Sequence, residues 1–314
     1  MKDCPSVEDI DEFVLESIAR PSRILAPVRW FGGKGNLAKW ILRYWPRGRF
    51  KLYVEPFCGA ASVFWHLPDP YPVEVLNDLD GRIVNLFRVL QDEDSFRKLC
   101  HRLIWTPYSR AEFRRALAIL NDLENRDAIT QAWAFFVAMN QGFSGVAKTE
   151  GNWSRAFIAH RGMADPTNKW RGRLRLLRYW HDRLTRVQID SRDAVEVIEY
   201  WDSAETLFYL DPPYIHGTRK VTNIYDVEPD DEFHQRLVET LLRIQGAVVL
   251  SGYRHPIYEP LEAAGWRRVD KETSCHAACK GRGSPLRGKG NALKHAPRTE
   301  SLWLSPRAVK GALL

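Results

Sequence analysis

Residues 51–62 are Lys51-Leu52-Tyr53-Val54-Glu55-Pro56-Phe57-Cys58-Gly59-Ala60-Ala61-Ser62, and they decide the fold. The apolar beginning predicts a strand that ends at Pro56, because proline cannot continue the hydrogen-bond ladder of a strand. The small residues at 58–62 then predict a tight turn, after which we expect a helix. A strand, a tight turn and a helix in this order predict one unit of an α/β domain.

The same alternation recurs along the chain. Apolar runs predict further strands at 73–76, 187–190, 207–210, 247–250 and 301–304. Helical spacing of apolar residues predicts helices at 6–20, between Asn36 and Pro46, around 83–90, after Asp193 and at 233–244. Short strands that alternate with helices are typical of a doubly wound α/β domain with a parallel sheet.

Residues 92–186 interrupt this alternation. Strand signals fade there, and helical periods such as Ile129, Ala132, Trp133 and Phe136 replace them. We therefore expect an α/β domain formed by residues 28–91 and 187–314, an inserted and mostly helical region at 92–186, and a helical N-terminal extension at 1–27.

The composition is that of a globular protein, and its positive net charge fits a polyanionic partner, although many basic proteins bind no nucleic acid. The chain has 314 residues, of which 45% are hydrophobic and 27% charged, with a net charge of +7. No apolar run is long enough to span a bilayer, and the first twenty residues are acidic rather than basic and apolar as in a signal peptide. We expect a cytoplasmic protein without a membrane partner. Its five cysteines, an odd number, are expected to be free thiols.

Two segments concentrate positive charge. The arginines of residues 171–186 are expected to face outward from a single helix, and residues 274–299 contain six Lys and Arg side chains with no acidic residue among them. We interpret both segments as contacts to nucleic-acid phosphates, with a solvated surface as the alternative.

The strongest local signal is Asp211-Pro212-Pro213-Tyr214, directly after the strand predicted at 207–210. Ligands of open α/β sheets bind at the carboxyl ends of strands. The Asp211 carboxylate and the Pro212 carbonyl could each accept one N–H of an amino group on an aromatic base, which favours a tetrahedral nitrogen and stabilises its developing charge. Neither Pro212 nor Pro213 has an N–H that would compete for these acceptors.

Tyr214 adds an aromatic face on which an extruded base could stack. The alternative is an ordinary turn at the end of a strand, since Asp-Pro and Pro-Pro are common turn dipeptides. This segment is therefore a candidate catalytic site for amino methylation.

The turn at 58–62 is a candidate cofactor site. It lacks the three-glycine spacing of dinucleotide sites, so a cofactor without phosphates fits better, and Gly59 allows close approach of the backbone. Asp78 follows the next strand, where an acidic residue commonly binds ribose hydroxyls. A helix-capping role for Asp78 is an equally good interpretation.

Four segments, in this order along the chain, carry a family resemblance. They are Arg29-Trp30-Phe31-Gly32-Gly33-Lys34, Glu55 to Phe64, Leu76-Asn77-Asp78 and Asp211-Pro212-Pro213-Tyr214. Together they resemble the Dam-type, D12 class (α-group) adenine-N6 DNA methyltransferases. The resemblance runs from about Val28 to Pro306 and includes Arg298-Thr299-Glu300-Ser301-Leu302-Trp303, which is similar to the closing strand of that family.

The resemblance implies a Rossmann-like, S-adenosylmethionine-dependent methyltransferase sheet with an inserted target-recognition region at 92–186. It implies that the chain methylates N6 of adenine in double-stranded DNA at a specific sequence, by base flipping. The residues implied to line the S-adenosylmethionine site are Trp30, Lys34, Gly59, Asp78, Asp193 and Asp211. A cation–π contact from Trp30 to the sulfonium and a Lys34 contact to the methionine carboxylate are physically compatible with this, whereas each alone could be an ordinary core aromatic or solvated charge.

DNA contacts are expected from the insertion and the basic loop. Residues 140–145 resemble a stretch of the family that touches or wedges into DNA, which makes Phe143 a candidate wedge, with a buried aromatic as the alternative. Lys148 stands near the place of a base-reading arginine, and Ser144 departs from the family pattern, so the target sequence is left open. Arg282, Arg287 and Lys289 are expected to contact phosphates.

Three other interpretations remain. The acceptors would also bind the amino group of cytosine, so transfer to cytosine N4 is an alternative, as is a catalytically silent DNA-binding protein with the same fold. Cys275 and Cys279, with His276 and His295, could form a zinc site. Structural zinc sites normally use paired short spacings on both sides, so we expect no metal.

Overall fold

The computed structural model describes residues 21, 24–30, 32–48, 50–122, 124, 127–143, 149–156, 159–160, 162–214, 231–274 and 297–310. The helix predicted at 6–20, the candidate residues Lys148, Arg282, Arg287 and Lys289, and the segment from Cys275 to Cys279 lie outside the described residues. The chain divides into two compact units: Met1–Gly33 with Gly81–Val187, and Lys34–Asp80 with Gln188–Leu314.

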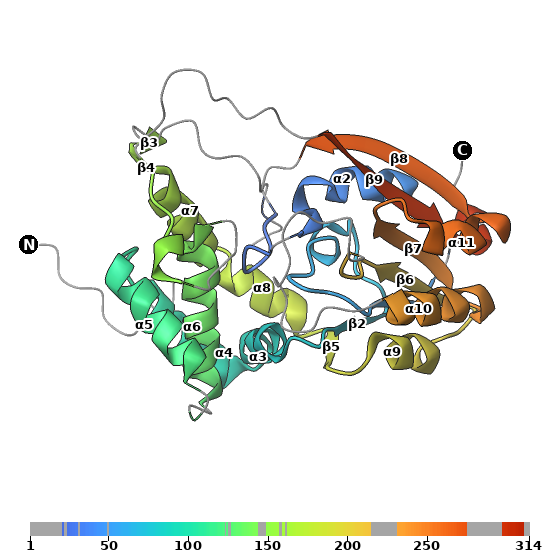
Figure 1. The fold of residues 1–314 in the computed structure, drawn as a ribbon. Coiled ribbons are helices and arrows are strands. Elements are labelled where there is room, and N and C mark those ends of the chain that lie inside the picture. Colours follow the sequence, from blue (N-terminus) through green and yellow to red (C-terminus); the bar gives the residue numbers. More distant parts are fainter. Residues whose placement is uncertain are drawn as a thin grey trace, which may run out of the picture. The chain divides into compact units, whose positions relative to one another are not determined.

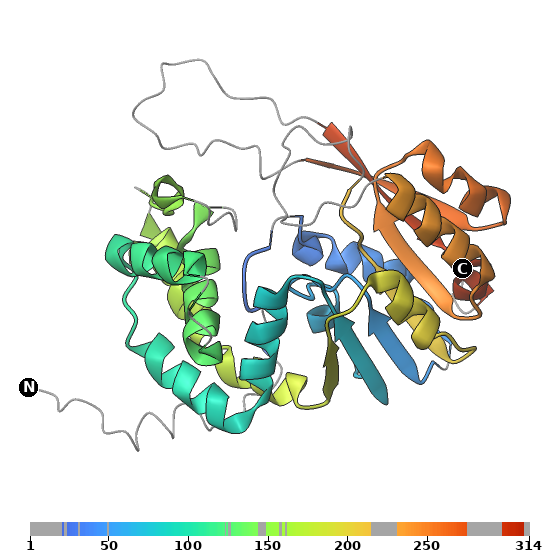
Figure 2. The same ribbon diagram turned by 60° about the horizontal axis from the view of Figure 1, so that its bottom comes forward.

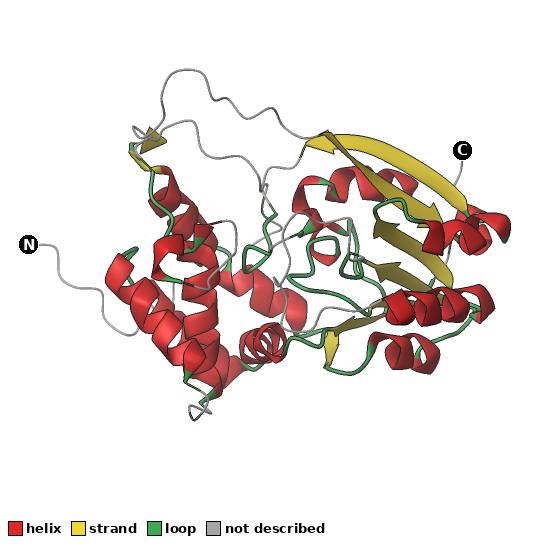
Figure 3. Ribbon diagram, in the orientation of Figure 1, coloured by secondary structure: helices red, strands yellow, loops and turns green. Residues whose placement is uncertain are grey.

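A seven-stranded mixed sheet confirms the predicted α/β class (Figure 3). The strands lie in the order β5-β2-β1-β6-β7-β9-β8, and their bounds are β1 Leu52–Glu55, β2 Val73–Asn77, β5 Val187–Asp190, β6 Thr206–Leu210, β7 Ala247–Gly252, β8 Arg267–Ser274 and β9 Pro297–Leu304. β1 pairs in parallel with β2 and β6, and β6 pairs in parallel with β7. β9 pairs antiparallel with both β7 and β8.

The sequence did not predict β8. Its eight residues are mostly charged or polar on both faces, so they carry no apolar alternation. β8 lies at the edge of the sheet, where charged side chains are tolerated, and it pairs with β9 from Arg267 opposite Leu304 to Ser274 opposite Pro297. Long-range pairing, rather than local pattern, therefore defines this strand.

Helices cover both faces of the sheet (Figure 1, Figure 2). On one face, buried side chains of β1, β6 and β7 form an apolar cluster with those of α9 Ala194–Tyr200, α10 Asp231–Arg243 and α11 Glu259–Ala263. On the other face, Trp45 packs against Tyr53 and Tyr209, and α2 Ala38–Ile41 lies on this side. α12 Pro306–Lys310 follows β9, and Ala308 in it is buried. β6 is buried along its whole length, as expected for a central strand covered on both faces.

Two predicted helices differ from the structure. The helix expected after the turn at 58–62 is only one short 3-10 turn, η3 Phe64–His66, because Pro68, Pro70 and Pro72 follow at once and cannot continue a helix. The helix expected between Asn36 and Pro46 is divided into η1 Lys34–Asn36, α2 and η2 Leu42–Tyr44. A further 3-10 turn, η6 Pro256–Tyr258, precedes α11.

The other unit is mainly helical, as predicted for the insertion. Its elements are α3 Gly81–Gln91, α4 Glu93–Ile104, α5 Arg110–Asn121, α6 Ala128–Gln141, η5 Glu150–Asn152, β3 Ala159–His160, β4 Met163–Ala164, α7 Asp165–Leu174 and α8 Leu177–Leu184. Side-chain caps from Asp92, Ser109 and Asp127 begin α4, α5 and α6. α6 is buried from Ala132 onward and is therefore the centre of this unit. No helix in the described ranges is both long and apolar enough to cross a membrane.

The single arginine-rich helix predicted at 171–186 is wrong in two respects. The segment forms the end of α7 and then α8, with Arg175 and Leu176 between them. Arg173 is buried rather than outward, because it lies on the same face of α7 as the buried residues Pro166 and Trp170.

Gly246 provides a test of the packing beneath β7. Its N–H donates to Asp202 Oδ1 at 2.8 Å, and a Cβ at this position would lie 2.6 Å from Cε2 of the buried Phe208 ring. We expect Gly246→Ala to lower the free energy of unfolding by about 1–3 kcal/mol through overpacking. Gly172→Ala is the matched control: it lies in α7 with open space around a Cβ, and should raise stability by about 0.5–1 kcal/mol. Denaturant unfolding of both variants measures this, and an unchanged or raised stability of Gly246→Ala would contradict the packing.

Glu55 at the end of β1 provides a pH-dependent test. It is fully buried and accepts a hydrogen bond from the Tyr53 hydroxyl. Burial raises the pKa of Glu55 from 4.5 to about 8, although the hydrogen bonds from Tyr53 and the Phe64 backbone act in the opposite direction. At a pH between these two pKa values, Glu55 is deprotonated in the unfolded chain but keeps its proton in the folded chain. The contribution of Glu55 to stability is therefore lost as the pH rises from about 4.5 to about 8.

We expect Glu55→Gln, which removes this titration, to gain stability relative to the unmodified chain as the pH rises through that window. The difference should become constant above a pH of about 8. Thermal unfolding of both proteins across the window measures it. Two melting curves that stay parallel with pH would show that Glu55 does not titrate in this way.

Candidate active site

The segment Asp211–Tyr214 leaves the sheet at its centre. It follows β6, which lies between β1 and β7, and Leu210 is paired with Leu250 of β7. The carboxyl ends of β6 and β7 therefore meet, and Ser251 and Tyr253 come beside Asp211 and Tyr214. The sequence placed the candidate catalytic segment correctly at the end of a buried strand.

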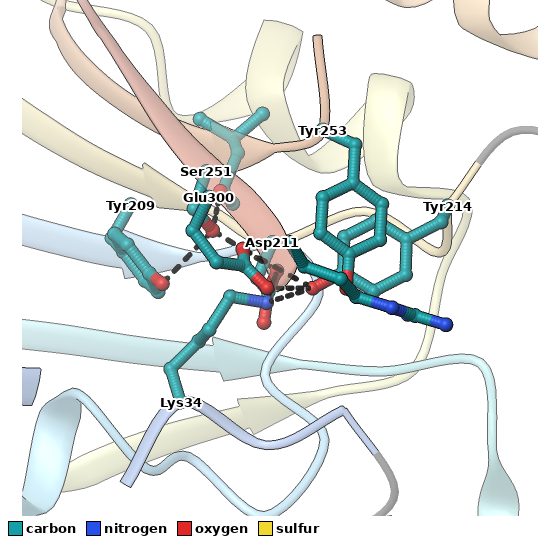
Figure 4. Close-up of polar contacts among 9 residues, drawn as sticks. Lys34, Tyr209, Asp211, Tyr214, Ser251, Tyr253 and Glu300 are labelled. Atoms are coloured by element: carbon teal, nitrogen blue, oxygen red, sulfur yellow. Dashed lines mark hydrogen bonds and ion pairs between the residues drawn. The ribbon is translucent and has the colours of Figure 1, made fainter. Parts of the chain in front are cut away.

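One ammonium group contacts both ends of this segment (Figure 4). Lys34 Nζ donates to Asp211 Oδ1 at 2.7 Å and to the Tyr214 hydroxyl at 2.7 Å. Ser251 Oγ lies 3.0 Å from the same Oδ1, and the Tyr209 hydroxyl lies 3.0 Å from Ser251 Oγ. Asp211 Oδ1 is thus anchored by a charge-assisted bond and a hydroxyl.

The two oxygens of Asp211 differ in their surroundings. No hydrogen bond reaches Oδ2 from any described part of the chain, and the Asp211 side chain is 20% exposed, whereas the Lys34 side chain is only 4% exposed. The buried cation holds one oxygen, and the other oxygen remains available as an acceptor. This is the arrangement that a positioned amino group would require.

Electrostatics fix the protonation of this cluster. Burial alone would lower the pKa of Lys34, but the carboxylates of Asp211 and Glu300 raise it above its ordinary value, so the group stays an ammonium. Burial, Asp211 and Glu300 raise the pKa of Tyr214 well above its ordinary value, so its hydroxyl stays neutral. Because an ammonium can only donate, the Tyr214 hydroxyl accepts from Lys34 and directs its own proton to Glu300, at 3.2 and 3.4 Å from the two carboxylate oxygens.

The Tyr214 ring is already stacked. It lies against Tyr253 with ring centroids 4.1 Å apart and an interplanar angle of 18°. Arg298 Nη1 donates to the Tyr253 hydroxyl at 3.0 Å. One face of the proposed stacking platform is therefore covered by Tyr253.

The small-residue turn and Asp78 form a second group of candidate residues. Gly59 N donates to Asp78 Oδ2 at 2.7 Å, and Asp80 N donates to Asp78 Oδ1 at 2.9 Å. Gly59 and Ala61 have positive φ angles of 46° and 54°, so the turn is sharply bent. Burial raises the pKa of Asp78 to about 6, against the effect of these backbone bonds. Asp78 therefore joins the turn at Gly59 to the backbone of Asp80, directly before α3.

Asn77 holds the neighbouring strand ends together. Its Nδ2 donates to the carbonyls of Pro56 and Arg192, and its Oδ1 accepts from Arg192 N at 2.8 Å. Asp193 follows, where its carboxylate caps α9 and pairs with Arg236 at 3.1 Å. The turn, Asp78 and the segment with Asp193 thus lie at the same edge of the sheet.

Trp30 and Phe143 belong to the other unit. The Trp30 ring lies 6.4 Å from Phe135 of α6 in an edge-on arrangement. Phe143 follows α6 and is 50% exposed, so the alternative of a buried aromatic is wrong.

Sequence reasoning missed Ser251, Tyr253 and Glu300. The available signal was Glu300, a charged residue directly before the apolar strand predicted at 301–304, but the residue it contacts, Tyr214, is 86 positions away. In the described part of the chain, no cluster of three or more His, Cys, Asp or Glu side chains could hold a metal ion.

Comparison with known proteins identifies the family. Residues 30–258 match the family model of the D12 class N6 adenine-specific DNA methyltransferases, a family that uses S-adenosylmethionine as methyl donor. The chain is 27% identical to the DNA N-6-adenine-methyltransferase of Escherichia phage P1 over 218 residues, which are 68% of this chain and 27% of that protein. It is 32% identical to the Type II methyltransferase M.CviBI of Paramecium bursaria Chlorella virus NC1A over 68 residues, which are 22% of this chain and 26% of that protein.

The matched regions thus span about a quarter of the length of each relative. Because the family model covers most of the chain, the chain belongs to the D12 class N6 adenine-specific DNA methyltransferase family.

Proposed function

We propose that this chain transfers a methyl group from S-adenosylmethionine to N6 of adenine in double-stranded DNA. The observation that carries the proposal is the asymmetry of Asp211, whose Oδ1 is anchored by Lys34 and Ser251 while Oδ2 has no hydrogen bond from the described residues. An acceptor held in this way can take one N–H of the target amino group without first reorganising.

The amino group of adenine needs such acceptors because its lone pair is delocalised into the ring. Asp211 Oδ2 and the Pro212 carbonyl would each accept one N–H, so the nitrogen becomes more tetrahedral and its developing positive charge is stabilised. Pro212 and Pro213 have no N–H that would compete for these acceptors.

The donor set fits S-adenosylmethionine. Lys34 offers a cation for the methionine carboxylate, Asp78 offers a carboxylate for ribose hydroxyls, and the bent turn at Gly59 offers backbone without a side chain. Trp30 and Asp193 are further proposed contacts of this cofactor. When bound, it supplies a methyl group activated by a sulfonium. The residues of the chain hold and orient the two reactants, and they need no metal or covalent bond to do so.

The target base must leave the duplex to reach Asp211, because its amino group is paired and stacked inside the helix. We propose that the helical unit and the basic segment at 274–299 hold the DNA, with Phe143 as a wedge and Lys148, Arg282, Arg287 and Lys289 as further contacts. A cytoplasmic location fits this substrate. Cytosine is the second candidate base, since Asp211 and Pro212 would accept from any exocyclic amino group.

Asp211→Asn tests the catalytic assignment while keeping the shape of the side chain. Its oxygen should remain with Lys34, which directs the amide NH₂ to the Oδ2 position, where it cannot accept an N–H from the substrate. We expect methyl transfer to unmethylated DNA to fall roughly 100-fold or more, a larger loss than the loss of cofactor affinity. Asp69→Asn is the matched control, because Asp69 is exposed in the loop before β2.

Radiolabelled methyl transfer and sequencing of modified bases are the two measurements. N6-methyladenine in DNA from cells that express the chain is the expected product. N4-methylcytosine instead would establish the second candidate, and full activity of Asp211→Asn would contradict the role of Oδ2. An unmodified chain that binds cofactor but transfers no methyl group to any DNA would point to a silent DNA-binding protein.

Phe143→Ala tests the wedge. Because Phe143 is half exposed, its truncation should leave the melting temperature unchanged and weaken DNA binding roughly fivefold to hundredfold, the range of one base–aromatic stack. Tyr200→Ala is the control, because Tyr200 is another exposed aromatic, 66% exposed, at the end of α9. A Phe143 variant that unfolds, with no separate defect in DNA binding, would exclude the wedge.

A further inference from the structure

Glu300 is a buried carboxylate in a strand. It lies on β9, directly before Ser301, which pairs with Gly252 of β7, and opposite Lys271 of β8. It is only 6% exposed, and the following residues of β9 from Ser301 to Leu304 are buried. Burying an apolar side chain at such a position would cost less free energy, because a buried carboxylate needs specific partners to replace its lost hydration.

The partners of Glu300 are residues of the proposed active site. The Tyr214 hydroxyl donates to its two carboxylate oxygens at 3.2 and 3.4 Å, and Lys34 donates to that hydroxyl at 2.7 Å. Burial raises the pKa of Glu300, while attraction to Lys34 opposes this effect. Figure 4 shows Lys34, Tyr214 and Glu300 arranged as one chain of hydrogen bonds beside Asp211.

This chain fixes the hydroxyl end of Tyr214. The ring has two constraints: its face stacks on Tyr253, and its hydroxyl is held between a donor, Lys34, and an acceptor, Glu300. A stacked pair can slide with little loss of energy, whereas a hydrogen bond to a charged group is directional. The contact with Glu300 is therefore the one that sets where the ring lies along the stack.

We propose that Glu300 is a positioning residue for methyl transfer, which holds the Tyr214 ring in place for the target base through its contact with the Tyr214 hydroxyl. The inference rests on the proposed function and extends it to a residue on the closing strand that does not itself touch the base. Removing the carboxylate should leave Tyr214 stacked but free to shift, so the rate of methyl transfer should fall more than the affinity for cofactor.

A double-mutant cycle tests this inference. Glu300→Ala and Tyr214→Phe should each lower the single-turnover rate of methyl transfer roughly tenfold to hundredfold, the range of one hydrogen bond to a charged group. Because both changes remove the contact between Glu300 and the Tyr214 hydroxyl, the two rate losses should not multiply in the double variant. Glu300→Gln keeps an oxygen that accepts from the hydroxyl and should recover part of the rate. Glu272→Ala, an exposed glutamate on β8, is the matched control and should behave as the unmodified chain.

Each outcome bears on the inference. Rate losses that multiply in the double variant, or full activity of folded Glu300→Ala, would overturn it. Equal losses in Glu300→Gln and Glu300→Ala would assign the effect to charge rather than to the hydroxyl contact, and would also overturn it. If Glu300→Ala does not fold, the rate of Tyr214→Phe tests the inference instead. A fully active Tyr214→Phe variant would exclude any role for the contact between Glu300 and the Tyr214 hydroxyl. An unmodified chain without activity on any DNA would contradict the proposed function itself, which is distinguishable from an active chain with a multiplicative cycle.

Discussion

The buried ion pair between Lys34 and Asp211 is the interaction on which the proposed site depends. An ammonium removed from water is costly unless charged partners replace its hydration, and the 2.7 Å contact to Asp211 provides the main replacement. The same ammonium binds the Tyr214 hydroxyl, so it holds the first and the last residue of Asp211–Tyr214. The two prolines between them restrict the backbone further. One cation therefore orients the whole segment.

The sheet determines where this pair can form. Parallel pairing of β1, β6 and β7 brings their carboxyl ends to one edge, and β6 is buried on both faces, which keeps Asp211 at a fixed depth. Antiparallel pairing of β9 with β7 then delivers Glu300 beside Tyr253. The acidic side chains of Asp211, directly after β6, and of Glu300, on β9, are far apart in sequence, so the site exists only after the sheet has assembled.

Local patterns predicted much of this fold, and the limits of prediction have physical causes. Strands with apolar side chains, such as those ending at Glu55 and Leu210, were predicted because burial imposes their composition. β8 was missed because an edge strand needs no apolar face. The position of Asp211 followed from the strand before it, whereas its partner Ser251 and the partner of Tyr214, Glu300, depend on pairing register, which no local pattern contains. The prolines after His66 explain why a predicted helix became one turn.

The stack of Tyr214 on Tyr253 bears on how a base would enter. A base placed on that face of Tyr214 must replace Tyr253, and the two stacks have similar energies, of order 1 kcal/mol. Such an exchange is nearly balanced, so it opposes base entry only weakly. It is productive only if the Tyr214 ring stays in place while its partner changes. The hydroxyl contacts to Lys34 and Glu300 supply that condition, because they hold the ring at its edge and leave its face to the stacking partner.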